Sequence, residues 1–546
     1  MNLRQKNLQQ LTESVLDVLV VGGGINGAVS AAALSARGAN VGLIDARDFA
    51  GFTSQQSSNL IWGGIKYLES YEFKLVAGLC KARNTLIKNY PSAVQEIRFL
   101  TTIPGGFRHH PRMVWAGAWL YWLFGRGFTR IPKYLSATRL KRAQPAIDTS
   151  KCRGGVEYSD AYLQDNDARF VFNFIRTAMG KGCLVANYLA AGKARREHDG
   201  VWKVQVEDKL NGKQLQIRCR TIVNAAGAFV DQFNARNGIE TQHKHVFSKG
   251  VHLIVPKVTE GKRVLAFFAD DGRLFFAIPM GNRTCIGTTD TPVVDPETGV
   301  TESDRKFILD NINARLDLPR PLSQDDIIAE RCGVRPLAVG NGAETEVDFL
   351  HLSRKHIIEV CADQSYLSIF GGKLTDCLNV GDEVCKKVAD LGVVLRFDGP
   401  DWFGEPAQRQ YDIYRGRGLT MSLDKIKFED TGESLLLRLW RRYGIDAHEI
   451  LDEIERDPSQ AQPAIKGTAL YRCEIKYLAE REMICSLEDL FNRRTKIGLV
   501  TPVETLKSSK ATMKLCRTLF AGEAQEQYDR YFHGDLNHFY SSSGLC

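Results

Sequence analysis

The sequence predicts an α/β fold, α+β overall, and three observations support this prediction. A β-branched run at 17–21 leads into a glycine-rich turn, an alanine-rich helix and a second strand. Another buried-strand pattern, at 221–227, also breaks at a glycine. Helical patterns dominate beyond residue 411. Strands that alternate with helices are typical of a parallel sheet covered by helices.

The first strand ends in a G-x-G-x-x-G turn that is typical of dinucleotide sites. Gly22 permits the tight turn, Gly24 lets the backbone approach a pyrophosphate, and Gly27 lets the following helix pack closely. The free N–H groups of that helix attract phosphates. Asp45 ends the next strand, where an acid accepts hydrogen bonds from a ribose. The predicted contact residues of the turn are Gly22, Gly24, Ile25, Asn26 and Gly27.

The helix of this unit, AVSAAALSARG, is expected to end at Gly38, a C-cap glycine. The second strand is NVGLID. The fingerprint alone does not distinguish FAD from NAD. The stretch 220–233 favours FAD, because many flavoproteins of the glutathione-reductase type have such a strand, which returns to the dinucleotide at a turn like that at Gly227. An ordinary strand–turn–helix is the alternative.

Length and composition set limits on the function. The chain has 546 residues, enough for two or three domains, with 44% hydrophobic and 25% charged residues. The net charge of +8 favours anionic substrates or an anionic membrane surface. The basic residues are scattered and zinc-finger spacing is absent, so nucleic-acid binding is not expected.

Cysteine usage and the N-terminal segment indicate a cytoplasmic protein. The thirteen cysteines include no C-x-x-C, so we interpret them as reduced thiols and expect no metal site. Residues 1–15 lack an apolar h-region, so no secretory signal is expected.

One apolar segment, MVWAGAWLYWLF at 113–124, is too short to span a bilayer. Twelve helical residues reach only about 18 Å, and a bilayer core needs about 30 Å. Its tryptophans, flanked by Arg112 and Arg126, suit a membrane interface. A buried core helix is the other interpretation.

Beyond these motifs the chain resembles the FAD-dependent glycerol-3-phosphate dehydrogenases, quinone-linked flavoenzymes of the membrane surface. The order and spacing of the matching motifs agree over nearly the whole chain. These motifs are TSQQSSNLIWGGIKYLESYEFKLV (53–76), VEYSDAYLQDNDAR (156–169), KGVHLIVP (249–256), FFAIPMGNRTCIGTTDT (275–291), CGVRPL (332–337), SIFGGKLT (368–375) and YLAEREMICSLEDLFNRRTKIGL (477–499).

The resemblance implies three domains. The first is a Rossmann-like FAD-binding domain of the glutathione-reductase type, made of residues 15–80, 150–235 and 330–395. A substrate-capping domain on a mixed or antiparallel sheet takes 81–149 and 236–329. A helical domain follows at 411–546, after the Gly- and Pro-rich boundary 395–410.

Within that last domain the sequence itself predicts helices at 433–444 and 446–457. Ser486 and Asp489 form a capping-box pattern before another.

The resemblance also implies a substrate pocket lined by cations. Positions that match basic pocket residues of the family are Arg335, Arg354 and Lys373, and Lys66 is a fourth candidate. Arginine suits a phosphate because its planar fork binds two oxygens at once. As isolated residues, each would be interpreted as a solvated surface charge.

For the base that takes the hydroxyl proton, His252 matches a family active-site histidine. An imidazole titrates near neutral pH. A core histidine bonded to the backbone is the alternative. Tyr67 is expected nearby, and Arg335 is a second candidate, as stabiliser of the alkoxide. The sequence does not decide between them.

Other positions match family residues near the flavin. Gly371, Gly372 and Lys373 resemble the loop whose N–H groups face the flavin, with Leu374 next. Ser57 and Ser58 match positions near its phosphates or ring. Plain turn chemistry is the alternative for all of them.

Two motifs depart from the family. Where it usually has S-[ST]-K-L-I-H-G-G-x-R-Y-L, this chain has Asn59, Trp62 and Lys66 in place of the Lys, His and Arg. After G-G-K the family continues L-T-T-Y-R, whereas this chain has Asp376, Cys377 and Leu378. Lys66 keeps the charge but loses the fork.

Three interpretations of function follow. The first is oxidation of sn-glycerol 3-phosphate to dihydroxyacetone phosphate by hydride transfer to FAD, with electrons passed to a quinone-type acceptor. The second is a flavin oxidoreductase or oxidase of the same fold that acts on another phosphorylated or phosphonate alcohol, or on an amine. The third is a non-catalytic FAD-binding protein. The first implies a peripheral location on the cytoplasmic membrane and allows a homodimer.

Overall fold

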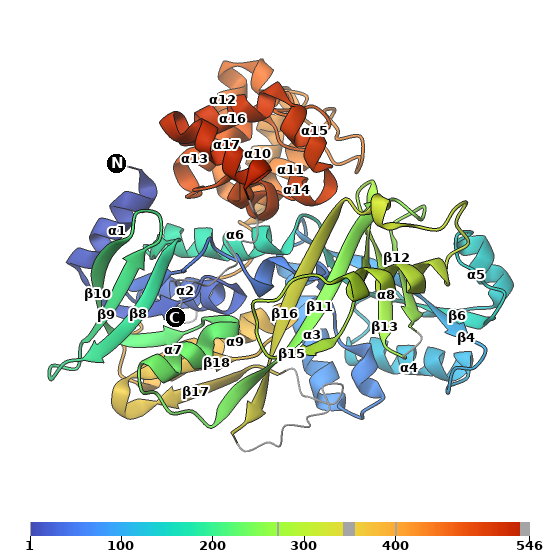
Figure 1. Cartoon of the computed structure of the whole chain (residues 1–546), viewed down its shortest axis with the longest axis horizontal. Helices are drawn as coiled ribbons and strands as arrows, with labels where there is room; N and C mark the ends of the chain where they lie inside the picture. The colour runs from blue at the N-terminus through green and yellow to red at the C-terminus, as the bar shows by residue number, and fades with distance from the viewer. Residues whose placement is uncertain (1, 270–271, 342–354, 399–400, 535–546) are drawn as a thin grey trace.

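The computed structural model describes residues 2–269, 272–341, 355–398 and 401–534 (Figure 1). In these residues, eight strands form sheet A, built around β1 (Val15–Val21). Its central strands are parallel, and it continues in an antiparallel meander through β9 and β8. The order is β17 (Ile357–Cys361), β18 (Tyr366–Phe370), β10 (Lys213–Asn224), β1, β2 (Val41–Ile44) and β7 (Leu184–Ala186). In addition, β9 (Trp202–Asp208) pairs with β10, and β8 (Leu189–Arg196) pairs with β9.

Helices pack on both faces of the parallel strands. On one face lie α2 (Ile25–Ala36), α6 (Asp167–Gly180) and α9 (Cys377–Asp390), which share a core with β1 and β2. Eight of the twelve residues of α2 are Ala, Gly or Ser, so its backbone comes close to its neighbours. The other face carries α1 (Leu3–Glu13), α7 (Val230–Arg236) and the meander. The predicted C-cap Gly38 has φ +84°.

Sheet B has ten strands in the described chain and is antiparallel except where β12 runs parallel to β4. Its long central strand β11 (His243–Pro256) pairs with β16 (Ala329–Gly340) over twelve residues. The remaining strands are β15 (Thr291–Val293), β14 (Arg283–Gly287), β13 (Leu274–Met280), β12 (Arg263–Phe268), β4 (Val94–Pro104), β6 (Cys152–Leu163), β3 (Leu60–Ile61) and β5 (Lys133–Leu135).

Sheet membership differs from the expected segments at three places. β3, β6 and β16 lie in sheet B, although all three fall in segments expected to belong to the FAD-binding domain. β6 pairs with β4 and β16 with β11, which are strands of the other expected domain, and β3 pairs with β6. Such pairing between distant segments has no local sequence signal. The helices around sheet B are α3 (Phe73–Asn89), α4 (Pro111–Phe124), α5 (Ala137–Ala143) and α8 (Glu302–Asn313).

The C-terminal part is helical, as expected, and Figure 1 shows its helices packed above the two sheets. The predicted helices are present as α11 (Leu435–Tyr443) and α12 (Ala447–Arg456). The capping box is also present, because Ser486 Oγ and Asp489 bond reciprocally, but the helix it opens (Asp489–Arg494) is a π-helix. The others are α10 (Gln408–Thr420), α13 (Arg472–Arg481), α14 (Ile497–Val500), α15 (Val503–Ser508), α16 (Lys510–Phe520) and α17 (Ala524–His533).

Buried ion pairs join this helical part to the rest. Asp48, in the loop after β2, accepts from Arg493 Nε at 2.7 Å and from Arg494 Nη1 at 2.7 Å. Arg169 on α6 donates to Glu482 at 2.6 Å. All five side chains are almost fully buried. The loop after β2 is therefore anchored by charge to the C-terminal helices.

Membrane spans and metal clusters were also sought. Within the described ranges, no helix is long and apolar enough to cross a bilayer. The same residues contain no His, Cys, Asp or Glu cluster that would hold a metal ion.

We predict that Asp48→Asn destabilises the fold strongly. The change leaves two buried guanidinium groups facing a neutral amide, and breaking a buried pair typically costs about 3–5 kcal/mol. Urea denaturation followed by circular dichroism would measure the loss. Asp452→Asn is the matched control, because Asp452 pairs with Arg417 while half exposed, where a pair contributes at most about 1 kcal/mol. Equal effects of the two changes would contradict the anchoring role of Asp48.

Candidate functional site

The glycine turn after β1 is built by close backbone contacts. Gly22 has φ +105°, and a Cβ there would lie 2.5 Å from the Ala225 carbonyl oxygen. A Cβ on Gly27 would lie 1.8 Å from the Gly22 carbonyl oxygen. Helix α2 begins at Ile25 after Gly24, which offers no side-chain cap, and the Ile25 N–H donates to Ser54 Oγ at 3.0 Å. Only glycine fits this turn, and the helix N-terminus opens into a pocket.

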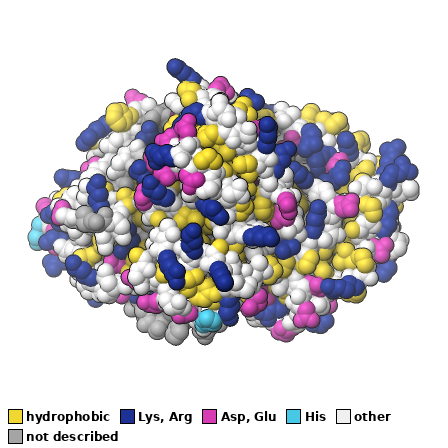
Figure 2. All heavy atoms as spheres, turned by 90° about the horizontal axis from the view of Figure 1, so that it is seen from above, with side chains coloured by type: hydrophobic (Ala, Val, Ile, Leu, Met, Phe, Trp, Pro, Cys, Tyr) yellow, Lys and Arg dark blue, Asp and Glu magenta, His cyan; other side chains and the backbone are white. Residues whose placement is uncertain are grey.

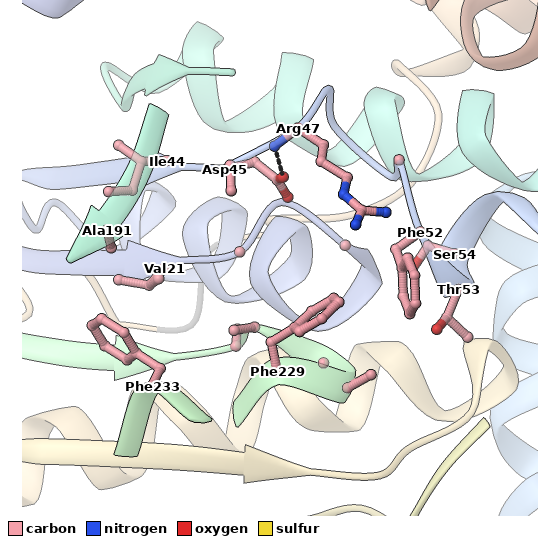
Figure 3. Close-up of a pocket in the computed structure, with 18 of the residues that line it drawn as sticks. Val21, Ile44, Asp45, Arg47, Phe52, Thr53, Ser54, Ala191, Phe229 and Phe233 are labelled. Atoms are coloured by element: carbon pink, nitrogen blue, oxygen red, sulfur yellow. Dashed lines mark hydrogen bonds between the residues drawn. The ribbon is translucent and has the colours of Figure 1, made fainter. Parts of the chain in front are cut away.

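That pocket has an empty volume of about 970 Å³ (Figure 3). Of the predicted cofactor residues, Gly22, Gly24, Asp45 and Gly227 line it. Sequence reasoning missed several other lining residues, which are Arg47, Phe52, Ser54, Phe229 and Phe233. A turn of glycines, a helix N-terminus, a carboxylate and apolar rings fit a dinucleotide with its pyrophosphate.

Asp45 stands at the edge of this pocket. Its carboxylate accepts the Gly23 N–H at 2.6 Å and the Arg47 N–H at 2.8 Å. Burial outweighs these bonds and raises the pKa of Asp45 to about 6. At neutral pH the group is a carboxylate with free lone pairs, which suits a ribose hydroxyl.

Arg47 closes the pocket on the side of sheet B. Figure 3 shows its side chain extending toward Phe52. Its guanidinium lies 5.0 Å from the ring centre of Phe52 and 5.7 Å from that of Phe229, and it pairs with Glu297 in the loop before α8. Its position two residues after Asp45 could have indicated that Arg47 lies near the pocket. The direction of its side chain could not be predicted from the sequence.

The serines predicted near the cofactor have other contacts. The Ser57 N–H donates to Asp167 Oδ2 at 2.7 Å, and Ser57 Oγ accepts the Asn59 N–H at 3.1 Å. Ser58 is half-buried. Neither lines the pocket, whose serine is Ser54.

The turn Gly371–Gly372–Lys373 follows β18 in left-handed backbone, with φ +62° and +106° at its glycines. Asn26 Nδ2 donates to the Gly371 carbonyl at 3.0 Å, so the turn is tied to helix α2. Leu374 then opens a short 3-10 turn, Leu374–Asp376. Because the turn is tied to α2, the predicted residues Asn26 and Gly371 do lie together.

Lys373 contacts the loop that carries Trp62 and Tyr67. Its Nζ donates to Tyr67 OH at 2.7 Å, lies 4.1 Å from the Tyr67 ring centre, and lies 5.9 Å from that of Trp62. Thr375 Oγ1 donates to the Trp62 carbonyl at 3.1 Å. Tyr67 is buried in the 3-10 turn Ile65–Leu68, which also carries the half-buried Lys66.

Arg335 lies across β11 at a position that only a glycine leaves open. A Cβ on Gly250 would lie 2.2 Å from Arg335 Nη2. The guanidinium donates to Thr288 Oγ1 at 3.1 Å and to Asp290 Oδ1 at 3.2 Å. A Cβ on Gly371 would lie 3.7 Å from the carbonyl oxygen of Pro336, the residue after Arg335. The structure therefore brings the Arg335 strand and the Lys373 turn together.

His252 is buried on β11, and its pKa differs from the near-neutral value expected from the sequence. Neither ring nitrogen has a hydrogen-bond partner among the described residues. Burial, with Arg331 and Arg335 nearby, lowers the pKa of His252 to about 3. The expectation that it titrates near neutral pH is thus wrong for the protein without substrate. It is a neutral imidazole with both nitrogens available.

Two departures from the family have local structural partners. Asn59, in left-handed backbone at φ +58°, accepts from Arg331 Nη1 at 2.8 Å and donates to the Asp165 carbonyl at 3.0 Å. Asp376 pairs with His356 at 2.6 Å. Trp62 packs beside Tyr67 and Lys373, and Lys66 directly precedes Tyr67 in the chain. Arg354, a predicted substrate residue, lies outside the described residues.

Comparisons with known proteins find the same family that the sequence motifs resemble. A family model described as FAD dependent oxidoreductase matches residues 17–363, and one described as C-terminal domain of alpha-glycerophosphate oxidase matches 422–527. The chain is 31% identical to the aerobic glycerol-3-phosphate dehydrogenase of Escherichia coli, over 88% of this chain and 94% of that protein. It is 32% identical to a glycerol-3-phosphate dehydrogenase of Pseudomonas aeruginosa, over 89% and 92%.

A solved structure shares the fold. The glycerol-3-phosphate dehydrogenase of Bacillus halodurans, complexed with FAD, superposes with a TM-score of 0.72 at 23% identity, covering 97% of this chain and 96% of that one.

We predict that Gly250→Ala lowers kcat/KM about 100-fold. The added Cβ displaces the Arg335 guanidinium. A displacement of about 1 Å near the reacting atoms can lower the rate by about 100-fold. Gly340→Ala, in the paired strand β16 with open space around its Cβ, is the control and should keep its rate. Steady-state kinetics on FAD-loaded protein would decide. Equal rates for both variants would argue against a role for Arg335.

Proposed function

Because this chain belongs to the FAD-dependent glycerol-3-phosphate dehydrogenase family, we propose that it oxidises sn-glycerol 3-phosphate to dihydroxyacetone phosphate. The family model covers more than half of the chain, and relatives above 30% identity carry this activity in their names. One observation carries the proposal furthest. It is a neutral buried histidine, His252, beside the cation Arg335.

The residues of the chain divide the work of an alcohol oxidation. FAD, when bound, supplies the two-electron acceptor. Arg335 and Lys373 provide positive charge for a phosphate, and the fork of Arg335 allows two bonds to it. His252, neutral and unbonded, is placed to accept the hydroxyl proton.

The low pKa of His252 is consistent with this role once substrate is considered. Arg335 and Arg331 contribute to lowering it, after burial. A phosphate dianion held by Arg335 offsets that positive charge and so raises the pKa of His252 toward the range of an effective base. The base strength of the imidazole is thereby coupled to occupation of the phosphate site.

A second candidate is a same-fold oxidoreductase or oxidase for another phosphorylated or phosphonate alcohol, or for an amine. Trp62 and Lys66 favour it, because a large apolar ring lies beside Tyr67 and Lys373 and an unforked cation directly precedes Tyr67 in the chain. Its acceptor could be oxygen rather than a quinone.

The deciding experiment adds glycerol 3-phosphate to the purified FAD-loaded protein without oxygen. We expect the flavin band at roughly 450 nm to bleach. Arg335→Ala should keep its FAD and stay yellow, because the phosphate loses its fork. Lys66→Arg should lower KM, since the fork is restored. A wild-type protein that dithionite bleaches but glycerol 3-phosphate does not would favour the second candidate.

For the electron acceptor we propose a quinone at a membrane surface, reached through an apolar patch around α4. One side of α4 is core, with Ala118 and Tyr121 buried. Its other side is exposed and continues through Phe73, whose ring lies 6.0 Å from Phe124. The patch consists of Tyr71, Phe73, Met113, Leu120, Leu123, Phe128 and Ile131.

Two features support this docking. The patch begins just after the loop that carries Trp62 and Tyr67, since Tyr71 comes four residues after Tyr67. Basic residues are also plentiful in the same part of the chain. Figure 2, seen from above, shows Lys and Arg side chains gathered at the right-hand end of the molecule, where Figure 1 places α5. The exposed basic residues of this part of the chain are Lys133, Arg139, Arg142, Lys151 and Arg153. Apolar and basic side chains together favour an anionic bilayer.

We predict that a Met113→Glu, Leu123→Glu double variant loses at least about tenfold in its affinity for anionic phospholipid vesicles, because two apolar side chains no longer enter the bilayer. Sedimentation with vesicles would measure this. Val394→Glu is the control, since Val394 is 72% exposed but lies outside the patch. If wild-type protein does not sediment with the vesicles, the membrane proposal fails.

A further inference from the structure

Two buried histidines hold the turn that carries Lys373, and neither matches a motif used above. His245 lies on β11, and His356 lies just before β17. Their side chains are 0% and 4% exposed. They contact opposite ends of the stretch Gly371–Asp376, and their hydrogen-bond partners dictate different protonation states.

His245 faces a group that can only donate. The Gly371 N–H donates to His245 Nε2 at 3.1 Å, so this nitrogen must be unprotonated. Its Nδ1 lies 2.9 Å from Asp231 Oδ2 and therefore carries the proton. Asp231 also accepts the His245 N–H at 3.0 Å, which fixes the carboxylate on α7. The ring is held as a neutral acceptor.

The surroundings of His245 are otherwise apolar or already paired. The rings of Phe370 and Phe247 lie 5.0 and 6.2 Å away, centre to centre. Glu359 on β17 pairs with His243, two residues along β11. Asp231 is thus the charged group bonded to His245. Protonation of Nε2 would point an N–H at the Gly371 N–H and break the bond that holds the turn.

His356 faces acceptors on both sides. Its Nδ1 lies 2.6 Å from Asp376 Oδ2, and its Nε2 lies 3.0 Å from Glu383 Oε2 on α9. Both nitrogens must donate to satisfy two carboxylates, so the ring is an imidazolium. Burial lowers and the two carboxylates raise the pKa of His356, and the net shift is upward. Asn379 also donates to Asp376, at 2.5 Å.

The second histidine also touches the turn by packing. A Cβ on Gly372 would lie 3.6 Å from His356 Cβ. The Asp376 N–H donates to the Lys373 carbonyl at 2.9 Å, so the carboxylate that binds His356 belongs to the same short turn as Lys373. Loss of the His356 proton leaves one ring N–H for the carboxylates of Asp376 and Glu383, so one of the two must lose its bond to the ring.

We propose that His245 and His356 are positioning residues for Lys373, which hold its turn only while His245 is neutral and His356 is protonated. The proposal rests on the function proposed above and adds the control of its site by pH. Protonation of His245 Nε2 removes the acceptor of the Gly371 N–H, and loss of the His356 proton removes the donor to one of its two carboxylates. While both rings keep their present states, Lys373 stays on Tyr67.

The first test needs no substrate. In FAD-loaded protein labelled with ¹³C at histidine Cε1, NMR at neutral pH should show His245 as the Nδ1–H tautomer and His356 as an imidazolium. The His356 signal, assigned by its loss in His356→Gln, should titrate at higher pH than free histidine in the same buffer. A neutral His356 or a protonated His245 at neutral pH would overturn the proposal, whatever the substrate is.

The second test is the pH profile of kcat/KM. His245→Gln supplies an amide oxygen that accepts from Gly371 and does not titrate, so it should keep its rate and lose part of the acid limb. His245→Leu removes the acceptor and should fall at least about tenfold. His356→Gln should lose rate and its share of the alkaline limb. His198→Gln, at an exposed position outside the site, is the control and should match wild type.

The outcomes distinguish a failure of the positioning role from a failure of the proposed substrate. Wild-type profiles in His245→Leu and His356→Gln would overturn the positioning role even if the NMR states are as expected. If glycerol 3-phosphate fails to bleach the flavin while NMR gives the expected states, the proposed substrate fails, and the profile is then measured with the substrate that replaces it.

Discussion

Carboxylates that accept backbone N–H groups are the constraint on which this site depends. The loops of the site flank strand ends, where no sheet partner takes their amide groups. In three loops one N–H donates instead to an aspartate from another element, so a single side chain fixes where the loop lies. The three pairs are Gly23 with Asp45, Ser57 with Asp167 and Gly63 with Asp160, and on strand β11 the His245 N–H donates to Asp231 in the same way.

Such anchors need compensating charge, and the structure supplies it from inside. Asp160 accepts from Arg83 at 2.8 Å, yet burial still raises the pKa of Asp160. Asp167 accepts from Arg331 at 2.6 Å. A buried ion pair contributes little net stability, because desolvation offsets its Coulombic attraction, but removing one partner is costly. The pairs therefore define loop geometry more than they add stability, and Arg331 also helps to keep His252 neutral.

Sequence patterns predicted what depends on local geometry. Local sequence causes account for the strand, glycine turn, helix and acid at the start of the chain. They also account for the left-handed Gly38 after α2 and for helices α11 and α12. What failed needed distant partners. Strands β3, β6 and β16 joined sheet B through pairing with remote segments. The low pKa of His252 depended on burial and on two arginines of β16, and the partner of Asp376 is a histidine twenty residues away.

The contacts of the residues that depart from the family show which departures bear on substrate specificity. Asp376 would weaken phosphate binding if its charge faced the pocket, but its carboxylate is used by His356 and Asn379. Asn59 is likewise used, by Arg331 and by the backbone. These two changes therefore concern how the site is held, and they give no reason to expect another substrate. Altered specificity is therefore favoured only by Trp62, which lies beside Lys373 and Tyr67, and by Lys66, which directly precedes Tyr67 in the chain.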